Sequence, residues 1–161
     1  MNRHRTIVIL SGLLAAFAWG REAPDQPLPY SHKAHAAAGL KCLDCHVNPD
    51  PGDAMTIPAA SKCMSCHVSI GSERPSIRKL ASFSKSKDPV PWVRVYALPA
   101  GIYWSHRSHT AAQVECRECH GDVAAMDRMA NVTGVTSMAG CVGCHKRVKA
   151  GNGCEFCHEG K

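Results

Sequence analysis

One pattern, C-x-x-C-H, occurs five times in this chain of 161 residues and uses all ten of its cysteines. The copies end in the five histidines His46, His67, His120, His145 and His158. Their cysteine pairs are Cys42 and Cys45, Cys63 and Cys66, Cys116 and Cys119, Cys141 and Cys144, and Cys154 and Cys157. With no cysteine left over, whatever binds these motifs dominates the chemistry of the chain.

The spacing of the motif is typical of covalent attachment of c-type haem. Two cysteines separated by two residues form thioethers with the porphyrin, and the adjacent histidine binds the iron from below. A single C-x-x-C also occurs in zinc sites and redox disulfides, and these are the alternatives. Repetition of the whole pattern favours haem, so we expect five covalently bound haem c groups with iron as the metal.

The fold is expected to be mostly coil with short α-helices and little sheet, wrapped around the five haems. Aromatic residues make up only 6% of the chain, so a side-chain core at this size is thin and haem must fill much of the interior. We predict short helices at 33–39, at 107–113 and around each motif. The alternating residues 93–96 predict one short strand.

An internal repeat divides the chain. Residues 31–46 and 105–120 are identical at half of their sixteen positions, and each copy places H-x-x-H ahead of a haem motif. An aromatic residue, Tyr30 or Trp104, precedes each copy. We therefore predict a dihaem half at 21–70, a linker without haem motifs at 71–100, and a trihaem half at 101–161.

Residues 1–20 read as a signal peptide. A basic start precedes an apolar run at 7–19, which is shorter than the about 20 residues that a membrane-spanning helix needs. We expect cleavage and export to the periplasm or beyond the cell. An uncleaved anchor, with association to the membrane, is the alternative.

The charge of the chain gives little support to a nucleic-acid partner. The formal net charge is +6, but five haems bring about ten propionates that offset it. A cluster of basic residues in the linker could dock an acidic redox partner, or could simply be a solvated face. Its members are Arg74, Arg78, Lys79, Lys85 and Lys87.

The two H-x-x-H segments supply four histidines that no haem motif uses: His32, His35, His106 and His109. A six-coordinate haem needs a second axial ligand, which His or Met provides. Residues three apart on a helix lie on one side, so the two histidines of a pair can reach different haems. Surface histidines are the alternative. In the first half, His32 and His35 serve the haems of His46 and His67 in either order.

Residues 106–158 resemble the triheme members of the class III multihaem cytochrome c family. In that family the first histidine of H-x-x-H binds the first haem and the second binds the next. The resemblance implies pairs of His106 with His120 and of His109 with His145. In the family a further histidine, just ahead of the second haem motif, binds the last haem. That position falls at or beside Met138, so this chain has methionine there.

The chain is similar also to the pentahaem cytochrome subunit of alternative complex III. The matching stretches are 57–58 with the second haem motif, 91–99, 103–106, 119–121 and 138–145. This resemblance implies electron transfer from quinol oxidation in the membrane towards soluble carriers.

The four H-x-x-H histidines leave the haem of His158 without a second axial ligand, and Met138 is the candidate for that position. A thioether ligand raises the potential of a haem relative to bis-histidine ligation, so we expect one higher-potential haem beside four low ones. Packing in the core is the commoner role of a methionine, and Met55, Met126 and Met129 are rival ligands.

The leading hypothesis is electron transfer by an exported pentahaem cytochrome that relays electrons between redox partners of a respiratory chain, with no catalytic residue of its own. One alternative is a multihaem reductase with an open iron at His158. Another is a non-catalytic haem subunit of a quinol-oxidising membrane complex, or a homo-oligomeric haem wire. The aromatic residues Trp92, Tyr96, Tyr103 and Trp104 are expected to pack the junction of the halves or to lie against haem edges.

Overall fold

The structure, a computed structural model, describes residues 23–48, 54–132 and 134–158, so the predicted signal peptide at 1–20 lies outside the described residues. Short helices joined by coil make up these ranges, and the described chain contains no strand ladder. One isolated antiparallel bridge joins Ile102 to His158. The helices are α1 (His32–Ala37), α2 (Cys42–Cys45), α3 (Ala60–His67), α4 (Pro75–Ser86), α5 (His106–Ala111), α6 (Cys116–His120), the 3-10 helix η1 (Val123–Ala125), α7 (Met138–Arg147) and α8 (Cys154–Cys157).

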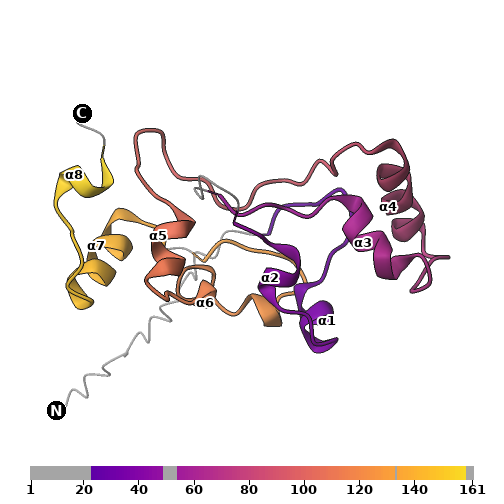
Figure 1. Cartoon of the computed structure of the whole chain (residues 1–161), viewed down its shortest axis with the longest axis horizontal. Helices are drawn as coiled ribbons and strands as arrows, with labels where there is room; N and C mark the ends of the chain where they lie inside the picture. The colour runs from indigo at the N-terminus through magenta and orange to yellow at the C-terminus, as the bar shows by residue number, and fades with distance from the viewer. Residues whose placement is uncertain (1–22, 49–53, 133, 159–161) are drawn as a thin grey trace, which may run out of the picture.

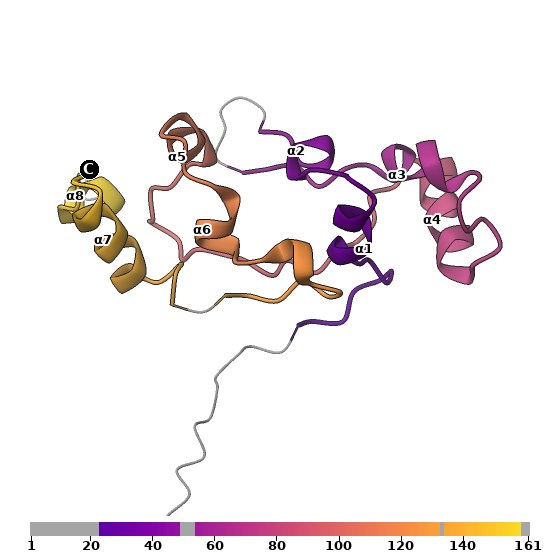
Figure 2. The same cartoon turned by 90° about the horizontal axis from the view of Figure 1, so that it is seen from below.

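The helices follow one another along the long axis of the molecule. Figures 1 and 2 show α3 and α4 at one end, α1 and α2 next to them, then α5 and α6, and finally α7 and α8 at the other end. The first half of the chain therefore occupies one end and the second half the other, and the haem motifs are spread over the full length between them.

Each haem motif lies on a helix, as predicted, because its cysteines begin or continue a turn that local hydrogen bonds hold in place. In α2 the Asp44 carboxylate accepts a hydrogen bond from the Lys41 N–H at 2.7 Å. In α7 the Ser137 hydroxyl caps the helix by accepting from the Gly140 N–H at 3.1 Å. One helical turn places the two cysteines and the histidine of a motif close together.

The two H-x-x-H helices are also as predicted, with small changes at their ends. α1 begins at His32 and α5 at His106, each one residue earlier than expected. Both are followed by a residue in the left-handed region at the same position of the repeat, Gly39 with φ of 89° and Gln113 with φ of 59°. The repeat in the sequence is thus a repeat in the backbone.

Side chains form a buried core only around α3 and α4 in the part of the chain that the structure describes. Its buried members are Leu28, Ala60, Leu80 and Val90. The helix α4 was not expected, because helices were predicted only at 33–39, at 107–113 and around the haem motifs. It forms because Pro75 suits the first turn, and Ile77, Leu80 and Phe83 lie on the face that packs against this core.

The predicted strand at 93–96 is wrong. No neighbouring strand in the described chain pairs with this segment, and the Gln26 side chain makes the two hydrogen bonds that a partner strand would make. Its amide donates to the Val93 carbonyl and its oxygen accepts from the Val93 N–H, both at 2.9 Å. One glutamine satisfies the extended backbone, so no ladder forms.

The two halves contact each other through α1 and η1. The Lys33 N–H donates to the Met126 carbonyl at 3.0 Å, and the Ser31 hydroxyl donates to the Asp127 carboxylate at 2.8 Å. Arg128 forms an ion pair with Asp25 at 2.6 Å. These bonds fix the second half against the start of the first.

Within the described ranges, none of the helices has the length and apolar character needed to cross a membrane.

Candidate haem-binding sites

Four pairs of imidazole rings face each other in the structure, and each pair joins one H-x-x-H histidine to one haem-motif histidine. The ring centres of His32 and His46 are 6.4 Å apart, and those of His35 and His67 are 6.1 Å apart. The second half repeats the arrangement. Its two pairs are His106 with His120 at 6.3 Å and His109 with His145 at 6.1 Å.

These separations fit one iron between each pair of rings. Two metal–nitrogen bonds of about 2 Å, together with the ~1.1 Å from each bonded nitrogen to its ring centre, place the ring centres about 6.2 Å apart. The four observed values lie between 6.1 and 6.4 Å. Rings in direct contact would lie closer, so the gap has the width of a shared metal.

The pairs differ in the angle between their ring planes, and the difference follows the repeat. The first histidine of each H-x-x-H is nearly parallel to its partner, at 19° for His32 and 7° for His106. The second histidine is crossed, at 60° for His35 and 46° for His109. The two halves thus contain one parallel and one crossed site each.

Backbone carbonyls orient most of these rings. In five of the histidines Nδ1 lies at hydrogen-bond distance from a carbonyl oxygen, so that Nδ1–H donates and Nε2 is left to bind a metal. The bonds are His35 to Ser31, His46 to Thr56, His67 to Ile70 and His109 to Ser105, each at 2.8 Å, and His145 to Gly151.

Burial affects the two parallel sites most. It lowers the pKa of His32 and of His120, and the adjacent imidazoles His46 and His106 lower them further. Nδ1 of both His32 and His120 is buried without a hydrogen-bond partner in the described chain. Neutral imidazoles held in this way are suited to a metal rather than to a salt bridge.

The first three motifs lie beside one another in space. Burial raises the pKa of Cys63, and the neighbouring Cys45 adds to the shift. Burial likewise raises the pKa of Cys116, with the Cys42 thiol at hydrogen-bond distance as a further cause. The second motif is therefore next to the first, and the first is next to the third, across the boundary of the two halves.

The last two motifs continue the same line. Burial raises the pKa of Cys119, and the nearby Cys141 and Cys144 contribute. Burial also raises the pKa of Cys141, with Cys157 as the next cause. The five motifs are thus arranged in one row, in the order of their histidines His67, His46, His120, His145 and His158, along the long axis seen in Figure 1.

The fifth site differs from the other four. His158 is fixed by the bridge to Ile102 and by the bond from the Tyr103 N–H to the Cys157 carbonyl at 2.8 Å. Among the described residues, no second imidazole is paired with it. Met138, the predicted second ligand, is the first residue of α7 and is 74% exposed.

The rival methionine Met126 packs elsewhere. Its methyl group lies 3.9 Å from the Cβ position of Gly121, and its carbonyl accepts the hydrogen bond from Lys33 that joins the two halves. Met126 therefore belongs to the contact between η1 and α1.

The cysteines of the motifs, all of them within the described residues, are not joined to one another. All ten cysteines are free. No group of three or more His, Cys, Asp or Glu side chains in the described chain is arranged to hold a bare metal ion.

One aromatic side chain lies against each pair of H-x-x-H histidines, a contact that the sequence indicated only through the position of these residues in the repeat. Tyr30 and Trp104 each contact both histidines of the H-x-x-H segment that follows. Burial raises the pKa of Tyr30 to about 12, and the nearby Cys45 and Cys63 add to the shift. Tyr30 therefore lies between the first two motifs with its hydroxyl protonated.

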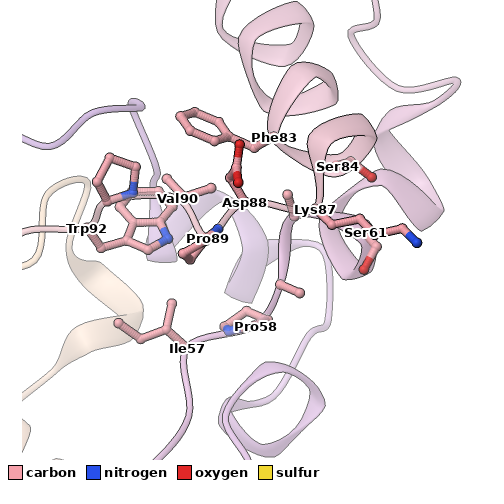
Figure 3. A pocket seen from close by; sticks show the side chains of 13 residues that line it. Ile57, Pro58, Ser61, Phe83, Ser84, Lys87, Asp88, Pro89, Val90 and Trp92 are labelled. Atoms are coloured by element: carbon pink, nitrogen blue, oxygen red, sulfur yellow. The ribbon is translucent and has the colours of Figure 1, made fainter.

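A cleft of about 650 Å³ lies beside α3, apart from the ring pairs. In Figure 3, Trp92 and Val90 lie on one side and Ile57 and Pro58 on another, with Phe83 of α4 above them. No motif cysteine and no predicted axial ligand lines it. The cleft lies between the chain at 57–61, where α3 begins, and the part of the linker at 83–92.

Comparison with known proteins gives one informative match. The chain is 28% identical over 162 aligned residues to the multihaem cytochrome c subunit of menaquinone reductase from Nitratidesulfovibrio vulgaris (strain Hildenborough), and the match covers 84% of this chain and 77% of that protein. No model of a known protein family matches. The similarity extends over most of the chain, and it supports a multihaem cytochrome c.

Proposed function

We propose that the protein transfers electrons in a respiratory chain through five covalently bound haem c groups. The observation that carries this proposal is the set of four imidazole pairs with ring centres 6.1 to 6.4 Å apart, each containing one haem-motif histidine. The similarity to a multihaem cytochrome c subunit supports it independently. When bound, each haem supplies an iron that takes up and releases one electron.

The residues of this chain would attach, orient and separate the haems. The ten motif cysteines would form the thioethers, and the five motif histidines would be the proximal ligands. Each H-x-x-H helix would cap two neighbouring sites, α1 those of His46 and His67, and α5 those of His120 and His145. Since the two histidines of a helix are three residues apart, one short helix fixes the spacing of two sites.

The row of motifs supports a relay along the molecule. Neighbouring motifs are joined either by a shared H-x-x-H helix or by adjacent cysteines, and no motif stands apart from the row. We infer that electrons enter and leave at the two ends, near α3 with α4 and near α7 with α8. The protein's own contribution is the choice of ligands, their burial and the spacing of the sites.

At the fifth site we propose Met138 as the second ligand of the His158 haem. Its side chain is exposed, α7 carries it next to the fourth motif, and the chain offers no further described histidine for this site. A thioether there would make this haem the one of highest potential.

We further propose that the protein is exported and acts with a membrane quinone-linked complex. The relative of 28% identity is a subunit of menaquinone reductase, and residues 1–20 read as a signal peptide. The resemblance to the pentahaem subunit of alternative complex III points in the same direction. The partners would be other redox proteins that meet the ends of the row.

The fifth site also gives the one specific reason to consider catalysis. If Met138 does not bind, His158 leaves an iron with an open position, as a multihaem reductase requires. Carbon monoxide distinguishes the two functions, because rapid stoichiometric binding to one ferrous haem indicates the open site, and absence of binding indicates a pure electron carrier.

The test of the proposed function is a redox titration of the exported holoprotein, followed by absorbance and by electron paramagnetic resonance (EPR). We expect five one-electron centres, four of them with bis-imidazole signatures and the fifth at the highest potential. A protein with fewer centres, or with mostly high-spin ferric haem, contradicts the proposal.

A further inference from the structure

The two aromatic residues that precede the H-x-x-H segments make the same contacts in both halves. The Tyr30 ring stacks on His35, with ring centres 4.5 Å apart and planes at 21°, and meets His32 edge-on at 4.8 Å. Trp104 stacks on His109 at 5.3 Å and 25°, and meets His106 edge-on at 4.1 Å. Each aromatic ring therefore contacts both histidines of the H-x-x-H segment that follows it. We call Tyr30 and Trp104, placed in this way, the two wedges.

The shared feature of the two wedges is a flat aromatic face. One is a phenol and the other an indole, so neither the hydroxyl nor the indole N–H is common to both. Their position in the repeat is the same, immediately before the serine that begins each H-x-x-H segment. The geometry is conserved between the halves while the polar group is not, which indicates that the face itself has the role.

A wedge of this kind restricts rotation of the ring that it stacks on. An imidazole bound through Nε2 can turn about its bond to the metal. The hydrogen bonds from His35 to Ser31 and from His109 to Ser105 limit this rotation, and the stacked aromatic face limits it further from the side. The histidines held in this way are the ones in the crossed pairs, at 60° and 46° to their partners.

We propose that Tyr30 and Trp104 are positioning residues that hold His35 and His109 in planes crossed to those of His67 and His145. This proposal rests on the haem ligation given under the proposed function. The angle between two axial imidazole planes sets the splitting of the iron d orbitals, and so it sets the EPR g values and contributes to the potential. The wedge thus makes the second site of each half different from the first.

The edge-on contact gives the wedge a second effect. Tyr30 meets His32 with its ring at 85°, and Trp104 meets His106 at 83°. One ring therefore touches a ligand of each of two neighbouring sites. A change of the wedge is expected to alter the crossed site most and the parallel site beside it less.

The experiment compares EPR spectra of the ferric holoprotein for wild type, Tyr30→Leu and Tyr30→Phe. We expect Tyr30→Leu to lose one of the two crossed-type signals, because the freed His35 ring turns towards the plane of His67. Tyr30→Phe is expected to keep the wild-type spectrum. Trp104→Leu should remove the other crossed-type signal, and Trp104→Phe should retain it. Phe83→Leu, at an aromatic residue of α4 that packs on the side-chain core and lies outside every haem motif, is the matched control and should leave both crossed-type signals in place.

The experiment also tests the proposal if a leucine variant does not acquire its full set of haems. In that case the exchanged protein, with Tyr30→Trp and Trp104→Tyr together, is measured, and the proposal requires that it show both crossed-type signals. Unchanged g values in a fully loaded Tyr30→Leu protein overturn the proposal, as does a loss of the crossed signal in Tyr30→Phe. Failure of the proposed function is distinguishable, because it removes the bis-imidazole signals from the wild type itself.

Discussion

Replacing Leu80 by alanine tests which part of the fold is stabilised by packed side chains rather than by haem. It is 6% exposed and belongs to the one buried side-chain cluster of the described residues, with Leu28, Ala60 and Val90. Replacing a buried leucine by alanine costs about 2–5 kcal/mol in protein cores. Because Leu80 joins α4 to α3, this loss falls on the docking of α4 and not on the ring pairs.

The loss of stability in α4 can be measured by amide hydrogen exchange of the holoprotein. A loss of about 2–5 kcal/mol in the free energy of opening corresponds to a roughly 30-fold to several-thousand-fold faster exchange of the α4 amides. We expect this acceleration in Leu80→Ala, with the number of haems and their spectra unchanged. Leu98→Ala, at a residue that is 40% exposed in the coil after α4 and outside every haem motif, is the control and should change exchange by no more than about twofold.

Two results would refute this reasoning. Exchange of the α4 amides at the wild-type rate would mean that Leu80 does not hold the helix. Simultaneous loss of ligation at all the haems would mean that the α3–α4 cluster is the core of the whole molecule, and that haem contributes less to the fold than proposed.

Three further predictions concern the ligands and the contact between the halves. Met138→His should lower the highest midpoint potential by about 60 mV or more, which is a tenfold change in a one-electron equilibrium, and a titration in which that potential stays in place contradicts Met138 as a ligand. His109→Met should raise one potential and remove one bis-imidazole signal, while an unchanged set of signals argues against the pairing. The pKa of Asp127 is lowered, first by the Ser31 hydroxyl and then by Lys33. The contact of Asp127 with Ser31 and Lys33 therefore stabilises the fold above about pH 4 and is lost as the pH falls through the lowered pKa. Exchange of the α1 amides in the wild type should become faster, relative to unstructured amides, as the pH falls through this range. In Asp127→Asn this change with pH should be absent.

Features that depend on local sequence could be predicted. Cysteines two residues apart with a following histidine need one helical turn, and all five motifs lie on helices. The H-x-x-H segments are helical for a similar reason, since Ser31 caps α1 by accepting from the Ala34 N–H at 3.1 Å. Neither feature depends on distant parts of the chain.

Features that depend on distant contacts could not be predicted. Sequence alone left open which of His32 and His35 faces His46, because both are on one helix and the choice depends on how α1 packs against η1. The order of the motifs in space could not be predicted either, because it requires Cys42 of the first half to lie next to Cys116 of the second.

The helix α4 and the segment 93–96 show the limits of composition as evidence. No helix was predicted in the linker at 71–100, but Ile77, Leu80 and Phe83 lie on one face of α4, and this face becomes stable once α3 covers it. Alternation in 93–96 suggested a strand, but the Gln26 side chain satisfies Val93 instead.

The most direct test of the central claim is the intact mass of the exported protein, followed by peptide mapping of its cysteines. Five haem masses on one polypeptide, with all ten cysteines in thioethers, are the result that this account predicts. Fewer than five attached haems, or cysteines oxidised to one another, would contradict it.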